Sequence, residues 1–275
     1  MYSVLLRLTF MPLLTRTNLH LSSCSSTCSL LLLQISMSSA NIIVQGDFCL
    51  TSSVNLSISI ANKKGLKADP WCTTGPPAGP LHYVYRRLQR VYRETSLPCF
   101  TETWLYQDTP DSVVSVNRLT LMRADRTAAE SGKKKGGGLA EFVNNSWCNP
   151  VHITVKRQLC SKDVELVAGS VRPYYLPREF SHVLAVTVYV PPSADAAAAC
   201  ERVHSTVSQL QTQHPQALIL FSGDFNHACL PLSAALPNFI QYVNCHTRDN
   251  KTLDLLYANA KNAYTSTTKN VHCSV

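Results

Sequence analysis

Four apolar runs in this chain end in, or contain, residues that could carry chemistry. Glu102 follows CFT, Tyr189 follows LAVTV, Asp224 and Asn226 follow LILFSG, and Asp254 lies within TLDLLY. Apolar runs of this length predict buried strands, and polar residues at their ends mark places where a sheet opens to solvent. A carboxylate among leucines, such as Asp254, needs a hydrogen-bonding partner or a metal ion. These positions are therefore the candidates for a functional site.

Each candidate also has an ordinary structural interpretation. A Glu after a strand is most often a surface residue. A Tyr before two prolines is most often a packed aromatic side chain. An Asp-x-Asn sequence after a strand can simply cap a turn. Taken one at a time, the residue types do not decide between these interpretations and a catalytic site.

From about residue 98 onward, the sequence pattern predicts the strands and the helix that must position these residues. VHITVKRQL and VELVAGSVR alternate with a period of two, which predicts a half-buried antiparallel pair. PCFTETWL, HVLAVTVYVPP, QALILF and TLDLLYAN predict further strands, and GGGLAEFV predicts a flexible loop that enters a strand. Ser193 is a plausible N-cap for a helix that ends near Gln213, because Val203, Val207 and Leu210 share one helical face. Strand pairs mixed with helices predict an α/β sandwich.

Residues 1–97 differ in character from the rest of the chain. Their apolar runs fall short of the ~18 residues that a membrane helix needs. Arg7 and the SMSSA segment fit a secretory signal only loosely, so we expect a nuclear or cytoplasmic protein. ADPWCTTGPPAGP reads as a turn-rich linker. We therefore predict a poorly ordered or unrelated segment at 1–97 and a folded domain at 98–275.

Charge and cysteine content bear on the partners. The net charge of +8 favours polyanions such as nucleic acid, phosphate esters or a membrane surface, although many basic proteins bind none of these. Lys133, Lys134 and Lys135 precede three glycines and are either a basic loop that contacts DNA phosphates or a solvated loop. His227 is a candidate for the rim of such a surface. The 11 cysteines lack paired metal-ligand spacing, which argues against zinc and favours a reducing compartment.

The order of the motifs resembles one known group of enzymes. FTETWL, RADRTAAESGKKKGGGLAEFVN, RPYYLPREF, TVYVPPSADAAAAC, SGDFNH and NKTLDLLYAN resemble the endonuclease/exonuclease/phosphatase superfamily. The sequences of these segments are most similar to the endonuclease domain of non-LTR (LINE-type) retrotransposons in fish genomes. The resemblance covers roughly residue 98 to the C-terminus, and it is the ordered set, more than any single motif, that is specific.

The resemblance implies a fold, a cofactor and a role for each candidate. The implied fold is a four-layer α/β sandwich of two mixed sheets, here incomplete at both ends. The implied reaction is phosphodiester hydrolysis on DNA with Mg²⁺ as cofactor, and Mn²⁺ is the alternative ion. The implied roles are a metal ligand for Glu102, a phosphate hydrogen bond for Tyr189, orientation of the attacking water for Asp224, support of phosphate and water for Asn226, and a position near the scissile phosphate for Asp254.

Two parts of the family pattern are not recognisable in this sequence. The family has an Asn on its first strand, for which Asn41 and Asn62 are the nearest candidates without a convincing context. The family also closes with Ser-Asp-His, whereas this chain closes with TSTTKNVHCSV, in which His272 is the only histidine. We therefore expect weak or no cleavage of DNA. Two alternatives stay open: an inactive nucleic-acid-binding remnant, and a phosphodiesterase or phosphatase for small phosphate esters.

Overall fold

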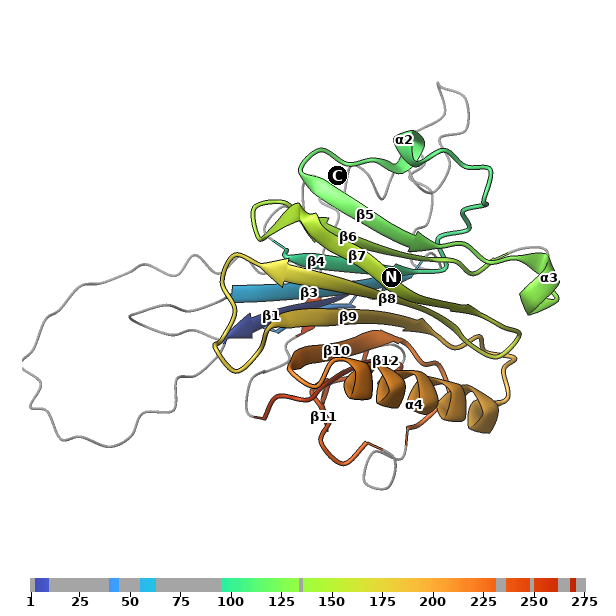
Figure 1. Cartoon of the computed structure of the whole chain (residues 1–275). Helices are drawn as coiled ribbons and strands as arrows, with labels where there is room; N and C mark the ends of the chain where they lie inside the picture. Colours follow the sequence, from blue (N-terminus) through green and yellow to red (C-terminus); the bar gives the residue numbers. More distant parts are fainter. Residues whose placement is uncertain are drawn as a thin grey trace, which may run out of the picture.

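Two mixed β-sheets face each other across an apolar core in the computed structural model (Figure 1). The structure describes residues 95–133, 136–230, 236–247 and 250–261, and it describes the strands at 3–9, 40–44, 55–62 and 268–270 by their backbone. No helix within these residues is long and apolar enough to cross a membrane.

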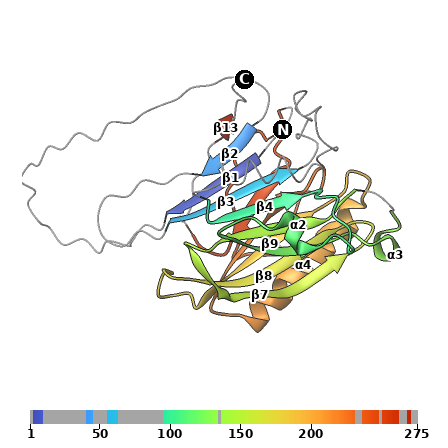
Figure 2. The ribbon, with the colours of Figure 1, turned by 90° about the horizontal axis from the view of Figure 1, so that it is seen from above.

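Sheet A has seven strands in the order β13-β2-β1-β3-β4-β6-β5. Figure 2 shows these strands side by side from the β13 edge to β4. The pairs β1–β2 and β3–β4 are parallel, and the other pairs are antiparallel. The strands are β1 (Ser3–Thr9), β2 (Ala40–Val44), β3 (Asn55–Asn62), β4 (Leu97–Thr101), β5 (Leu119–Ala124), β6 (Leu139–Asn144) and β13 (Thr268–Asn270).

Sheet B has six strands in the order β11-β12-β10-β9-β8-β7. Only the central pair β9–β10 is parallel, because an 18-residue helix connects these two strands. The strands are β7 (Cys148–Cys160), β8 (Glu165–Pro173), β9 (His182–Tyr189), β10 (Ala217–Asp224), β11 (Ile240–Gln241) and β12 (Asp254–Ala258). The predicted pairing of the VHITVKRQL and VELVAGSVR segments is confirmed as β7 with β8.

The period-two pattern of the strands decides what each face of sheet B buries. In β9, Val183 and Ala185 pack into the core between the sheets, whereas Leu184 and Val186 pack towards the connecting helix. Since each strand has two apolar faces, sheet B lies between two layers, which is the arrangement that near-continuous apolar strands predict. The predicted α/β sandwich with two mixed sheets is confirmed.

Three helices accompany the sheets in the described residues. They are α2 (Asp111–Val114), α3 (Ala128–Ser131) and α4 (Ala196–Gln213). Helix α4 covers the outer face of sheet B and buries Val203, Val207 and Leu210, as the spacing predicts (Figure 1). At β4 and β6, Val116, which follows α2, packs on Phe100 and Phe142 of sheet A.

Helix α4 starts two residues later than the sequence suggested. The N-cap is Asp195, whose Oδ1 accepts hydrogen bonds from the backbone N–H groups of Ala197 and Ala198 at 2.9 and 3.3 Å. Ser193, the predicted cap, instead accepts a hydrogen bond from the side chain of Lys133. Asp and Ser are equally good N-caps, so residue preference does not decide which of the two starts the helix. The path of the backbone after β9 decides it.

Three strands of sheet A come from the segment 1–97, and β3 pairs with β4. Strand pairing alone does not measure how much this segment contributes to stability. The domain boundary at residue 97 therefore stays a prediction.

Candidate functional site

Four polar residues form one row across the end of sheet B. In the strand register, Glu165 lies opposite Tyr189, Tyr189 opposite Asp224, and Asp224 opposite Asp254. Directly opposed residues in a sheet point to the same face. That face is the one towards sheet A, because Leu220, four positions before Asp224, and Leu256, two positions after Asp254, lie in the core between the sheets. The sequence therefore brings three of its predicted site residues together by register alone.

Glu102 reaches the same place from sheet A. It follows β4 directly, and its Oε1 accepts a hydrogen bond from the hydroxyl of Tyr189. Burial, and then the hydrogen bond and charge of Glu102 and the charge of Asp224, raise the pKa of Tyr189 well above its ordinary value. Tyr189 is consequently a neutral hydrogen-bond donor between two carboxylates.

The Gly-Asp-Phe-Asn segment has a geometric reason for its glycine. A Cβ on Gly223, which has φ +156°, would lie 1.7 Å from the backbone oxygen of Val188 on the neighbouring strand. Asp224 Oδ1 accepts a hydrogen bond from the backbone N–H of Asn226 at 3.0 Å, and the Asn226 side chain donates to Val190 O at 2.8 Å. Asn226 has φ +49° and lies in the turn that follows β10. Its side-chain amide holds Val190, the residue that follows β9.

These side chains are more enclosed than a solvent-open cleft would make them. Tyr189, Asp224 and Asp254 are only 1–3% exposed, and Glu102 is 9% exposed. In the part of the chain that the structure describes, the predicted residues converge without lining an open cleft. Enclosure raises the strength of every charge interaction within the group.

The glycine-rich segment does not behave as the free loop that its sequence predicts. Backbone N–H groups of Thr103 and Trp104 donate to Gly138 O and Gly137 O at 3.1 and 2.8 Å. Gly136, Gly137 and Gly138 all have φ between +73° and +84°, a region in which three successive side chains would be strained. The glycines thus hold the two residues directly after Glu102 in place through backbone hydrogen bonds.

The sequence analysis missed two charged residues next to the site. Arg126 and Glu165 form a buried ion pair, and Glu165 Oε2 also accepts a hydrogen bond from Gly138 N at 2.7 Å. The Arg126 guanidinium lies 5.7 Å from the centroid of the Tyr189 ring. Glu165 has a signal in the sequence, because it opens an apolar strand just as Asp254 opens its own.

A second polar group lies deeper between the sheets. Glu141 on β6 is fully buried and accepts a hydrogen bond from the Thr187 hydroxyl at 2.6 Å. Burial raises the pKa of Glu141 to about 8, because the surrounding core favours the protonated form of this carboxyl. Burial and then the charge of Glu141 raise the pKa of the Cys99 thiol, which is therefore an unreactive core group.

The predicted nucleic-acid contacts gather at one loop, the segment 191–195 between β9 and α4. Lys133 Nζ donates to Ser193 Oγ at 2.7 Å, and the exposed His227 ring lies with Nε2 3.1 Å from Ala194 O. Lys134 and Lys135 lie outside the described residues. The two described side chains are thus close to the end of β9, where Tyr189 lies.

Strand pairing places Asn62 near Glu102, a position that its local sequence does not indicate. Asn62 closes β3 and lies opposite Thr101, the residue before Glu102. Asn41 belongs to β2, and β1 and β3 separate β2 from β4. His272 lies outside the described residues. Of the two asparagines, Asn62 is therefore the one whose strand adjoins the strand that leads to Glu102.

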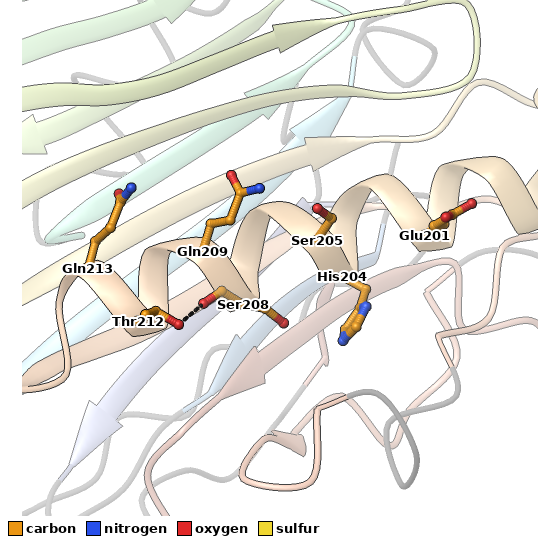
Figure 3. A pocket seen from close by; sticks show the side chains of 7 residues that line it. All are labelled: Glu201, His204, Ser205, Ser208, Gln209, Thr212 and Gln213. Atoms are coloured by element: carbon orange, nitrogen blue, oxygen red, sulfur yellow. Dashed lines mark hydrogen bonds between the residues drawn. The ribbon is translucent and has the colours of Figure 1, made fainter.

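Two hollows lie in the described residues, and Glu165 is the only member of the row that borders either of them. One, of about 490 Å³, is bordered by Glu165, Arg123, Asp125 and Glu130 at the edge between β5 and β7. The other is a depression of about 500 Å³ along the exposed side of α4 from Glu201 to Gln213 (Figure 3). None of the predicted site residues lines either hollow.

The sequence matches no protein-family model and no curated protein. Three solved structures that resemble the fold are Danio rerio TDP2 complexed with single-strand DNA product, the human Nocturnin catalytic domain with bound sulfate, and a mannosyl-6-phosphatase of Bacteroides thetaiotaomicron. Their identities are 10%, 11% and 12%, and their TM-scores 0.48, 0.46 and 0.47. The matches cover 74%, 65% and 74% of this chain and 83%, 73% and 85% of those chains. Similarities at this level carry no inference about what this chain binds or does.

Proposed function

We propose that this chain is a divalent-metal-dependent phosphodiesterase acting on DNA, of the type found in non-LTR retrotransposon endonuclease domains. The observation that supports it most is the register row of Tyr189, Asp224 and Asp254 together with the Tyr189–Glu102 hydrogen bond. These residues come from motifs far apart in the chain, and those motifs occur in the order that the family resemblance requires.

The donor chemistry of the site fits a hard cation. Glu102 accepts the hydrogen bond of the Tyr189 hydroxyl and Asp224 is the cross-strand neighbour of Tyr189, so two carboxylates adjoin one residue. The described residues contain no group of three or more His, Cys, Asp or Glu side chains arranged to hold a metal. Mg²⁺ does not need such a group, because it is often bound through one or two carboxylates and keeps several waters. Glu102 would hold the ion, and the ion would supply charge neutralisation at the phosphate.

The protein residues supply orientation and hydrogen bonds. Asp224, with Oδ1 already fixed by Asn226 N–H, is placed to accept a hydrogen bond from a nucleophilic water. Tyr189 is a neutral donor, and its hydroxyl would donate to a nonbridging phosphate oxygen. Asp254 lies opposite Asp224, and its carboxylate would add to the negative charge that favours a cation. Lys133 and His227 would meet the flanking DNA backbone.

A nicking assay on supercoiled plasmid with Mg²⁺ tests the proposal. We expect weak nicking by the full chain, which Asp224→Asn lowers to the level without protein, because the residue orients the nucleophile. Asp108→Asn is the matched control, since it makes the same chemical change at an exposed turn. Equal rates for the two variants would contradict the assignment of Asp224.

The two alternatives give different outcomes in the same experiment. An inactive nucleic-acid-binding remnant binds a labelled duplex without nicking above the Asp224→Asn level. A phosphatase for small phosphate esters hydrolyses bis(p-nitrophenyl) phosphate or a sugar phosphate but leaves the plasmid intact. The net charge of +8 is what favours the polyanionic substrate over the small ester.

A further inference from the structure

A buried ion pair lies directly beside the row of site residues. The side chains of Arg126 and Glu165 are 6% and 3% exposed, and Glu165 is the cross-strand partner of Tyr189. Burying two charges is costly unless the charges also satisfy other groups. This pair contacts Tyr189 and the backbone of Gly138, and both of these adjoin Glu102 or the residues that follow it.

The first connection runs through Tyr189. The guanidinium of Arg126 lies over the Tyr189 ring at 5.7 Å from its centroid, within the range of a cation–π contact. The hydroxyl of the same ring donates to Glu102. Arg126 therefore constrains the residue that orients the Glu102 carboxylate.

The second connection runs through the glycine-rich loop. Glu165 Oε2 accepts from Gly138 N, and the carbonyls of Gly138 and Gly137 accept from the N–H groups of Thr103 and Trp104. The loop lies directly on the ion pair, because a Cβ on Gly137 would stand 2.2 Å from Arg126 Cζ. The chain that follows Glu102 is thus attached to the same pair.

We propose that the Arg126–Glu165 pair is the positioning device of the site, which fixes Glu102 from its side-chain end through Tyr189 and from its backbone end through Gly137 and Gly138. Its catalytic consequence rests on the proposed function, whereas its structural consequence does not. A pair that only stabilised the fold would not single out the two amides after Glu102.

The first test measures backbone hydrogen exchange in the full chain. Arg126→Met is expected to speed exchange of the Thr103 and Trp104 amides by about tenfold or more, because their acceptors lose support, while amides of the central strand β10 keep their protection. Arg123→Met is the matched control. Arg123 lies on the same segment but pairs with Asp111 and Asp125, away from Tyr189 and the glycines.

Two results would overturn the proposal. One is unchanged exchange at Thr103 and Trp104 in Arg126→Met. The other is an equal, general increase in exchange across the chain in both arginine variants, which would make the pair a stabilising element only. Where Arg126→Met fails to fold, Glu165→Gln takes its place, since it keeps the side-chain shape while removing the charge that holds Arg126 and Gly138.

The second test measures catalysis and is read separately. With DNA nicking by the parent chain established, Arg126→Met is expected to lower kcat by about 10–100-fold, as loss of an outer-sphere support of a metal ligand does, with a much smaller change in KM. Arg126→Lys should recover part of kcat, because it returns the charge over Tyr189. No nicking by the parent chain would contradict the proposed function and leave the exchange result standing, whereas nicking with an unchanged kcat in Arg126→Met would overturn the positioning role.

Discussion

Gly223 shows how tightly one residue of the site is specified. Its missing side chain lets β9 and β10 come together just before Asp224, since a Cβ would meet Val188 O at 1.7 Å. Gly223→Ala must push two backbones apart, and we expect it to cost about 3 kcal/mol or more of unfolding free energy. Urea unfolding at equilibrium measures this.

The matched control for that substitution is Gly169→Ala on the same sheet. A Cβ on Gly169 meets the terminal atoms of Met122, which can move, although it would also lie 3.2 Å from Glu141 Oε2. We therefore expect a smaller loss of stability for Gly169→Ala. A loss as large as that of Gly223→Ala would contradict the view that backbone contact sets the cost.

Glu141 should give the fold a pH dependence of definite sign. Burial raises its pKa from 4.5 to about 8, so the folded state keeps a proton that the unfolded state releases. Its stabilising contribution is complete below pH 4.5 and is lost as the pH rises towards 8. The loss has a limiting slope of about 1.4 kcal/mol per pH unit.

Glu141→Gln tests that dependence, because the amide keeps the shape and accepts the Thr187 hydrogen bond without titrating. The difference in unfolding free energy between the variant and the parent should move in favour of the variant from pH 5.5 to pH 8. A difference that is constant with pH would show that Glu141 is ionised in the folded chain.

Among single residues, the sequence indicated those at the ends of apolar strands and missed those that support them. Glu102, Tyr189 and Asp224 follow or close apolar runs and Asp254 opens one, and a polar residue next to an apolar run is visible in the sequence alone. The function of Arg126 depends on a contact with Tyr189, 63 positions later in the numbering, and no local pattern encodes such a contact. Glu141 was missed for the same reason, since its partner Thr187 lies on the other sheet.

At the scale of elements, strands with two buried faces or a clean alternation were predictable. The segments that became β8, β9, β10 and β12 are buried on both faces, whereas β7 is mostly exposed and was predictable from the alternation in its sequence. β5 was not predicted because its residues are mostly half-buried and carry no clean period. β11, with two residues, is too short to have a period at all.

The N-cap of α4 is the element-scale feature that the sequence placed wrongly. Asp195→Ala removes the two hydrogen bonds to Ala197 and Ala198, and we expect a loss of about 1 kcal/mol. Ser193→Ala, at the position first predicted as the cap, removes an exposed contact with Lys133 and should cost less than about 0.5 kcal/mol. Equilibrium unfolding of both variants distinguishes the two caps, and the reverse ranking would return the cap to Ser193.

For the whole molecule, the open question is how the segment 1–97 relates to the rest. The sequence-based boundary predicts that proteolysis leaves a stable core starting near Pro98. The sheet favours a longer core. All five residues of β4 are buried, which is unusual for an edge strand, and β3 is the neighbour that covers its free edge.

We expect limited digestion of the full chain, followed by mass spectrometry, to yield a core that retains β3 and therefore begins at or before Asn55. The physical reason is that removing β3 would expose the hydrogen-bonding groups and apolar side chains of β4, next to Glu102. A chain restricted to residues 98–275 serves as the comparison and should aggregate or lose cooperative unfolding. A soluble, cooperative fragment starting near Pro98, with unchanged exchange at the Thr103 and Trp104 amides, would instead support the boundary at residue 97 and remove Asn62 from the site.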